Sequence, residues 1–326
     1  MNLNKIAQLT NSKIVGDPNY KISGISSVNN PSKSKITILL SEKHLSSKLD
    51  LAGAILTNKS IAESLPNQNI LISNQPKVSF ALLSNCFYKQ PSKPLFNKKN
   101  NCFLGEDVQI GLNFLCGSNV VIEDNVSIGD NVSLGHNVVI KSGVTIGNFV
   151  NIESGTIIGS EGFGNSLTSD QKWEHIRHLG SVAIGNNVSI GSNCTIDRAT
   201  LDETIICDGV IIDNLVHIAH NVVIGENTAI AAKVGIAGSC SIGKRNMIGG
   251  MVGIVDHITT VDDVIISATS TVNRNINEPG VHTGIMPILN HTKWKRVALW
   301  ITKLDKIARL INLKKVKWLH KWTLMK

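Results

Sequence analysis

The chain carries an apolar residue at every sixth position over a long central stretch. One series runs in steps of six from Leu104 to Ile158, a second from Ile184 to Ile196, and a third from Ile206 to Ile254. A second apolar residue, often Val, lies two positions earlier in many hexads, and Gly often follows the Ile. A six-residue period means that each unit is one short strand and one turn, with Gly or Asn relieving the backbone at the corner. Only stacked coils of such units bury a continuous apolar column.

An ordinary β-sandwich is the main structural alternative. Its turn signals come about every 8–12 residues and drift in phase. Here nine isoleucines follow one another at constant spacing between Ile206 and Ile254. The repeat therefore predicts a mainly β chain built on a parallel β-helix.

Three regions of different character divide the chain. Residues 1–100 lack the six-residue period and predict a small α+β domain, which closes with a helix near Phe80–Tyr88 and a Pro- and Lys-rich linker. Residues 101–275 hold the β-helix. Residues 276–326 predict a helical extension with one buried stripe, because apolar residues follow steps of four and three at Val297, Ile301, Leu304, Ala308 and Ile311.

Two segments interrupt the repeat, Gly159–Ser181 and Asp197–Thr204. A loop that leaves a regular solenoid is either a tolerated surface insertion or part of a binding site. The first segment has a Gly-rich start and then Trp173, His175 and His178. This content favours a binding role for it.

Charge is concentrated at the C-terminus. The net charge is +8, yet the segment His291–Lys326 has eleven Lys and Arg against Asp305 alone, which gives +10 and leaves −2 for the rest. Such a cluster favours an acidic partner. No nucleic-acid motif accompanies it, so nucleic acid is not expected, and an anionic membrane surface stays open. The candidate docking residues are Lys293, Lys295, Arg296 and Lys303.

The remaining composition indicates a cytoplasmic protein. The six cysteines form no CxxC pair, as expected for reduced thiols and not for a zinc site. No apolar run approaches the ~18 residues that cross a bilayer. The polar start of the chain lacks the apolar core of a secretory signal.

Four segments carry a resemblance to one family: IVGDPNYKISGISSV, GSEGFG, IDNLVHIAHNVVIG and EPGVHTGIMP. They resemble the UDP-3-O-acylglucosamine N-acyltransferases of lipid A synthesis. The resemblance implies a left-handed helix with three hexads in each coil and a homotrimer. It also implies transfer of a 3-hydroxyacyl chain from acyl carrier protein to the 2-amino group of UDP-3-O-acylglucosamine. No metal and no bound cofactor are expected, because phosphopantetheine arrives on the carrier.

The resemblance makes His220 the general base. An amine that attacks a thioester must lose a proton, and an imidazole of ordinary pKa ~6.5 can accept it near neutral pH. Gly238 lies one coil of three hexads later, and His257 two coils and one residue later. Strand spacing of ~4.8 Å would align the three along one face over roughly 10 Å. Gly238 would then offer its N–H to the oxyanion, and His257 would be a second site histidine.

Asp213 and Asn214 match the acid–amide pair that precedes the base in this family. Asp213 would orient the imidazole and stabilise its charged form, either at a corner of one chain or across a trimer interface. The alternative is a turn Asp that bonds its own backbone.

The N-terminal region departs from the family pattern at the expected uracil platform. Ile38, Ser41 and His44 stand where relatives have Phe, Asn and Tyr, and Ile38 cannot stack on a base as an aromatic ring does. Arg274 is a further candidate for substrate binding. Acyl chain length is not readable from the sequence.

Three rival functions fit the sequence less well. His217 and His220 suggest the γ-type carbonic anhydrases, but the third histidine, His257, does not have that spacing. A hexapeptide O-acyltransferase of the same pathway would lack the N-terminal domain and the IDNLVHIAH segment. A non-catalytic trimer that binds nucleotide-sugar is the alternative from another class.

Overall fold

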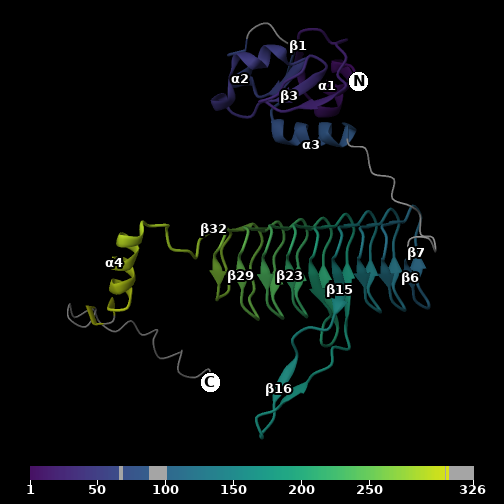
Figure 1. Ribbon diagram of the computed structural model, residues 1–326, viewed down its shortest axis with the longest axis vertical. Helices are drawn as coiled ribbons and strands as arrows, with labels where there is room; N and C mark the ends of the chain where they lie inside the picture. Colours follow the sequence, from purple (N-terminus) through teal and green to yellow (C-terminus); the bar gives the residue numbers. More distant parts are fainter. Residues whose placement is uncertain (66–68, 88–100, 305, 308–326) are drawn as a thin grey trace. The chain divides into compact units, whose positions relative to one another are not determined.

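The computed structural model describes residues 1–65, 69–87, 101–304 and 306–307 (Figure 1). Two compact units make up the chain, Met1–Ser92 and Lys93–Lys326. The boundary predicted at residue 100 falls among residues outside the described ranges.

The first unit is a five-stranded sheet with helices. The strand order is β1-β5-β4-β3-β2, with β1 antiparallel to β5 and the others parallel. Its elements are α1 (Leu3–Thr10), β1 (Lys13–Val15), β2 (Gly24–Ser26), β3 (Lys35–Ile38), η1 (Glu42–His44), η2 (Ser47–Leu51), β4 (Ala54–Thr57), α2 (Lys59–Ala62), β5 (Ile70–Ile72) and α3 (Pro76–Phe87).

Both faces of this sheet are covered by apolar side chains. Leu56 of β4 packs in a cluster with residues of α1 and α3, whereas its neighbour Ile55 packs with Ile61 of α2. Successive residues of a strand point to opposite faces, so the two clusters lie on opposite sides. The predicted closing helix begins at Pro76, earlier than Phe80, and buries Leu83.

The second unit is a parallel β-solenoid with three sheets. The first sheet contains β7 (Gln109–Ile110), β10 (Ser127–Ile128), β13 (Thr145–Ile146), β18 (Ser181–Ile184), β21 (Glu203–Ile206), β24 (Val223–Ile224) and β27 (Ser241–Ile242). The second contains β8 (Leu115–Cys116), β11 (Ser133–Leu134), β14 (Asn151–Ile152), β19 (Ser189–Ile190), β22 (Ile211–Ile212), β25 (Ala229–Ile230), β28 (Met247–Ile248), β30 (Val264–Ile266) and β32 (Gly280–His282). The third contains β6 (Phe103–Leu104), β9 (Val121–Ile122), β12 (Val139–Ile140), β15 (Ile157–Ser160), β20 (Thr195–Asp197), β23 (His217–Ile218), β26 (Gly235–Ile236), β29 (Gly253–Ile254) and β31 (Thr271–Val272).

The coil length follows the repeat, and the interruptions are insertions between coils. Ile128 pairs with Ile146, three hexads further on, whereas Ile146 pairs with Ile184 across the first interruption. The inserted residues include the antiparallel hairpin of β16 (Asn165–Leu167) and β17 (Trp173–His175), which projects from the solenoid (Figure 1). Ile196 pairs with Ile218 across the second interruption, which is much shorter. The coils on either side of both insertions therefore stay in register, apart from a local shift between Ile158 and Ser160 where β15 pairs with β20.

Asn and Gly shape the corners of the coils. Asn125, Asn131 and Asn137 have positive φ, a conformation that Asn tolerates better than most residues. Gly129 has no such φ, but a Cβ there would lie 2.8 Å from the backbone of Gly147 in the next coil. The predicted relief of the corner by Gly or Asn is confirmed, because Gly143, Gly155 and Gly209 also have positive φ at this corner position. Glycines that follow the Ile directly, such as Gly129, have a second role and permit close stacking of coils.

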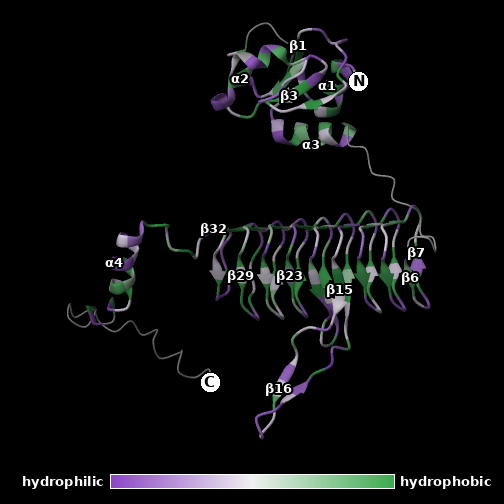
Figure 2. Cartoon of the chain, viewed as in Figure 1, coloured by the Kyte–Doolittle hydropathy of each residue, from purple (hydrophilic) through white to green (hydrophobic). Residues whose placement is uncertain are grey.

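The predicted mainly β chain on a parallel β-helix is confirmed. Hydrophobic residues recur along the strands (Figure 2), and the inward Val and Ile of successive coils form one continuous buried cluster. The solenoid continues to β32, past the end predicted at residue 275. No helix among the described residues combines the length and apolar character needed to cross a membrane.

The C-terminal helix is α4 (His291–Ile301), and its predicted buried stripe is wrong. None of its residues is buried, and Ile301 and Leu304 are exposed. The spacing correctly predicts a helix here, but no other described element of this chain covers the apolar face. Ala308 and Ile311 lie outside the described residues.

Truncating a coil isoleucine should destabilise the solenoid. Ile146 is only 4% exposed, and a buried Ile→Ala change costs ~2–5 kcal/mol. We expect Ile146→Ala to lower the midpoint of thermal unfolding clearly. Thr145→Ala is the matched control, because Thr145 is the exposed neighbour in β13 and should change stability by at most ~0.5 kcal/mol. Equal losses of thermal stability for the two variants would contradict the stabilising role of the buried apolar column.

Candidate functional site

His220 lies at a corner of the solenoid, just after the end of β23. Its Nδ1 is 3.1 Å from the side-chain oxygen of Asn221. If Nδ1–H donates to that oxygen, Nε2 is left as a proton acceptor. Asn221 is fixed in turn, because its Nδ2 donates to the carbonyl of Leu201 and its oxygen accepts from the N–H of Thr200. The short insertion therefore holds the residue that orients His220.

Gly238 lies directly over the His220 ring. A Cβ at Gly238 would be 2.6 Å from Nε2 of His220. Any residue other than glycine at this position would therefore displace the imidazole ring. The carbonyl of Gly238 accepts from the N–H of His257 at 3.0 Å. Consecutive coils thus bring His220, Gly238 and the backbone of His257 together, at the spacing that the sequence predicts.

The N–H of Gly238 is uncapped among the described residues. At the matching corner position of some other hexads, a side chain one coil further on accepts this hydrogen bond. The N–H of Glu106 donates to Asp124, and that of Leu112 donates to Asp130. No such bond is formed by the N–H of Gly238 with any described group. A free backbone donor beside an imidazole can stabilise an oxyanion.

The long insertion returns to cover His220. His178 is 2% exposed, and its ring meets that of His220 edge to face with centroids 5.2 Å apart. A Cβ on Gly162 would lie 3.2 Å from both Nε2 of His178 and Oδ2 of Asp197 and 3.3 Å from Cδ2 of His220. Three ionisable side chains therefore converge on the Gly162 backbone.

The surroundings of His178 favour its neutral form. Its Nδ1 lies 3.1 Å from the carbonyl of Ile176, so Nδ1–H donates there, and its buried Nε2 has no hydrogen-bond partner among the described residues. Burial lowers the pKa of His178, and the nearby His220 lowers it further. The hydrogen bond to the Ile176 carbonyl and the charge of Glu161 act in the opposite direction on this pKa.

This neutral histidine should make stability depend on pH. An unfolded His takes up a proton near pH ~6.5, whereas the folded chain resists it, so stability is present above that pH and is lost as the pH falls through it. We expect His178→Asn to reduce the fall in melting temperature between about pH 7.5 and about pH 5.5. Asn can still donate to Ile176. An unchanged slope would contradict the neutral assignment.

A buried carboxylate lies among the histidines. Asp197 is 7% exposed, and its Oδ2 is 3.7 Å from Nε2 of His217. Burial raises the pKa of the Asp197 carboxyl, while His217 and His220 act to lower it. Nδ1 of His217 is 2.7 Å from the hydroxyl of Thr195.

Asp213 and Asn214 lie at the preceding corner, after β22. Oδ1 of Asp213 accepts from the N–H of Asn214, and Oδ1 of Asn214 accepts from the N–H of Ser192. Within one chain Asp213 makes no hydrogen bond to His220 among the described contacts. A pairing between chains stays a prediction.

The residues that surround His220 were only partly visible in the sequence. The aromatic content of the long insertion indicates His178, but nothing in the sequence pattern distinguishes Asp197 or Asn221. The interruptions themselves were the available signal, because both insertions contribute to this corner. Their contacts with His220 have no periodic signature.

The nucleotide candidates lie near the carboxyl ends of β3–β5. Ile38 packs partly against the core, Ser41 caps η1 by accepting from the N–H of Lys43, and His44 is exposed. A pocket of about 270 Å³ lies close to them in sequence, lined by Leu40, Asn58, Gln75, Pro76, Lys77 and Val78. Ligands commonly bind beyond the carboxyl ends of parallel strands.

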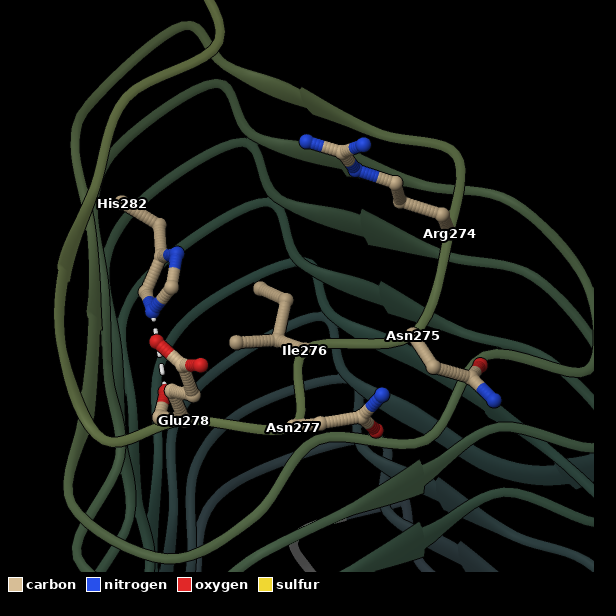
Figure 3. Close-up of a pocket in the computed structure, with 6 residues that line it drawn as sticks. All are labelled: Arg274, Asn275, Ile276, Asn277, Glu278 and His282. Carbon is tan, nitrogen blue, oxygen red and sulfur yellow. Dashed lines mark hydrogen bonds between the residues drawn. The ribbon is translucent and has the colours of Figure 1, made fainter. Parts of the chain in front are cut away.

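Arg274 lies in the last coil and lines a pocket of about 600 Å³. Figure 3 shows Arg274 and His282 on opposite sides of this pocket with Ile276 between them. Nε2 of His282 lies 2.9 Å from the carbonyl of Glu278. None of the residues around His220 lines this pocket, so the structure does not join Arg274 to that corner.

The tail candidates Lys293, Lys295 and Arg296 are exposed on α4, and Lys303 is exposed just after it. No group of three or more His, Cys, Asp and Glu among the described residues could hold a metal ion.

The comparisons identify the kind of protein. The family model "Bacterial transferase hexapeptide (six repeats)" matches residues 203–238, which include His220 and Gly238. The acyltransferase structure from Francisella novicida, a UDP-N-acetylglucosamine acyltransferase, superposes with a TM-score of 0.52 at 24% identity, over 59% of this chain and 70% of that one. The solenoid fold is therefore that of the hexapeptide-repeat transferases.

Two relatives identify the family within this class of transferases. The UDP-3-O-acylglucosamine N-acyltransferase of Vesicomyosocius okutanii is 50% identical over 323 residues, 96% of this chain and 97% of the relative. That of Ruthia magnifica is 49% identical over the same shares. The chain belongs to the UDP-3-O-acylglucosamine N-acyltransferase family and is an acyltransferase.

Proposed function

We propose that the chain transfers a 3-hydroxyacyl group from acyl carrier protein to the 2-amino group of UDP-3-O-acylglucosamine in lipid A synthesis. Family membership supports the reaction class, since relatives of nearly full length carry this name. The arrangement of His220 against the uncapped N–H of Gly238 is the observation that carries the mechanism.

His220 is the proposed general base. The amine attacks the thioester carbonyl, a C–N bond forms, and the amine proton moves to Nε2. The carbonyl oxygen becomes an oxyanion, which the N–H of Gly238 stabilises. Collapse of this intermediate breaks the C–S bond, and the thiolate leaves with the proton returned from His220. Asp197 favours the charged imidazole during this step.

The remaining roles complete the proposal. Asp213 and Asn214 would act on His220 of a neighbouring copy in a homotrimer, because they lie at another corner of their own chain. The N-terminal unit, with Ile38, Ser41 and His44, would hold uridine, and Arg274 would contact substrate. The cations Lys293, Lys295, Arg296 and Lys303 would dock the carrier. The reaction needs no metal or bound cofactor, and its carrier and nucleotide-sugar place it in the cytoplasm.

One incubation tests this function. The purified chain is mixed with carrier thioesters of several lengths and UDP-3-O-acylglucosamine, and the products are read by mass spectrometry. We expect one acyl group to be added, with loss of the free amine. Acylation of a sugar hydroxyl would favour an O-acyltransferase, and tight sugar binding without turnover would favour a non-catalytic binder.

A further inference from the structure

The ring of His178 lies against the imidazole proposed as the general base. The ring centroids of His178 and His220 are 5.2 Å apart and the ring planes meet at 70°, an edge-to-face arrangement that aromatic pairs prefer. Nε2 of His178 and Cδ2 of His220 border the same backbone group, because a Cβ on Gly162 would lie 3.2 Å from the first atom and 3.3 Å from the second. The Nε2 edge of His178 therefore lies beside the base.

The long insertion fixes His178 in this position. A Cβ on Gly164 would lie 2.5 Å from Cε1 of His178, so the ring packs directly on the backbone there. The N–H of Gly164 donates to the carbonyl of Gly162, and the N–H of Ile176 donates to the carbonyl of Gly164. Nδ1–H of His178 donates in turn to the carbonyl of Ile176. These hydrogen bonds hold the imidazole without using Nε2.

Packing does not explain why residue 178 is a histidine. Its Nε2 is buried and has no hydrogen-bond partner among the described residues. An unpaired buried acceptor lowers stability, and an apolar side chain of similar shape avoids that loss. Such groups are rare in folded proteins, and departures of this kind are expected at functional sites. The unpaired nitrogen therefore points to a role in the chemistry of this corner.

A lone pair beside His220 has a chemical use. The base becomes positively charged when it takes the amine proton, and a lone pair carries partial negative charge. This lone pair is already in place and shielded from water, so solvent does not weaken its attraction for the charged ring. The effect requires a neutral His178, because a second positive charge would oppose the first. Burial and the nearby His220 both lower the pKa of His178, in agreement with that requirement.

We propose that His178 is a positioning residue for His220, and that its unpaired Nε2 stabilises the imidazolium that forms during acyl transfer. Cδ2–H of the charged His220 ring would donate to Nε2 of His178 as a weak hydrogen bond. The proposal rests on the proposed function of His220 as the general base. It assigns His178 a role that acts through that base and requires no contact with the substrate.

Other ionisable groups lie around the two imidazoles. Oδ2 of Asp197 is 3.7 Å from Nε2 of His217, and Oε2 of Glu161 is 2.7 Å from Nε2 of His175. All of them stay in place when residue 178 alone is replaced, so its variants can be compared against a constant set of charges. The set comprises Glu161, His175 and Arg177 of the long insertion, Asp197 of β20 and His217 of β23.

Replacements of His178 separate its lone pair from its packing. His178→Phe keeps an aromatic ring and His178→Leu keeps a smaller apolar side chain, but both remove Nε2. His178→Gln keeps an oxygen acceptor near the position of Nε2. We expect both apolar variants to lower kcat by about three- to fivefold, the usual effect of one weak hydrogen bond, with KM nearly unchanged. His178→Gln should retain most of the parent kcat.

A titration that needs no turnover measures the same effect directly. The chain is labelled at its histidine rings, and the NMR signal of His220 is identified by its absence from His220→Ala. In His178→Phe the charged ring loses the neighbouring lone pair, so we expect the titration midpoint of His220 to fall by about half a pH unit. The midpoint should stay near the parent value in His178→Gln. An unchanged midpoint in both apolar variants would overturn the proposal.

The outcomes distinguish this proposal from the proposed function. If the parent does not acylate the amine, the proposed function fails, and the titration still measures the effect of the lone pair on His220. If the parent transfers the acyl group and both apolar variants keep its kcat and its titration midpoint, only the role of His178 fails.

Ile128→Ala is the control for lost stability. Ile128 is 3% exposed, close to the 2% of His178, and it lies several coils before the base. This variant should lower the melting temperature and leave both kcat and the titration midpoint of His220 near the parent values. Equal changes of kcat in Ile128→Ala and His178→Phe would mean that lost stability, and not the lone pair, accounts for the effect.

Discussion

His220→Ala should lower kcat for acyl transfer by about 10²–10⁴-fold, the usual contribution of a general base. The ring has one nitrogen at Asn221 and the other against Gly238, which is the arrangement that the proposed proton transfer uses. KM for the nucleotide-sugar should change little, because the proposed uridine site lies in the other unit. Steady-state kinetics with a saturating carrier thioester measures both values.

A matched histidine controls for loss of fold. His136 also lies just after a coil strand, but its Nδ1 accepts from the N–H of Ser118 and so caps a corner. His136→Ala should lower the melting temperature and leave kcat near the parent value. Near-normal turnover by His220→Ala would contradict the assignment of His220 as the general base. Added imidazole should partly restore activity to the His220 variant alone.

The solenoid was predictable because the six-residue repeat of the sequence corresponds directly to the repeat of strand and turn in the structure. Wherever the repeat is unbroken, each residue lies above the residue three hexads earlier, so Gly238 could be placed over His220 by counting. The same counting fails at the insertions. Hairpin β16–β17 has no period, and the burial of His178 depends on how that hairpin returns to the corner.

The other features that the sequence does not predict have a similar cause. Spacing indicates that α4 has an apolar face, but it does not indicate what covers that face. The sequence shows that Ile38 cannot stack on a base, and the structure adds that it packs against the core of the first unit. Asp197 ends β20 as one of many corner residues, and only its burial beside His217 distinguishes it. Tertiary contacts, and not local pattern, select these side chains.

Gly238→Ala should lower kcat by about 10²-fold while leaving the fold intact. The added Cβ would lie 2.6 Å from Nε2 and Cε1 of His220, so the ring must move away from the reacting amine. A misplacement of ~1 Å can cost about 10²-fold in rate. The same methyl would crowd the N–H proposed to bind the oxyanion, and loss of such a donor costs ~10²–10³-fold.

Gly235→Ala is the matched control for this variant. Gly235 lies in the same coil, at the start of β26, and a Cβ there would have no atom within 4 Å. Neither glycine has a positive φ, so backbone strain is not the difference between the two variants. We expect Gly235→Ala to retain the parent kcat and both variants to keep the parent melting temperature. Comparable loss of kcat in both would mean that the coil tolerates no added methyl, and the contact between Gly238 and His220 would lose its proposed role.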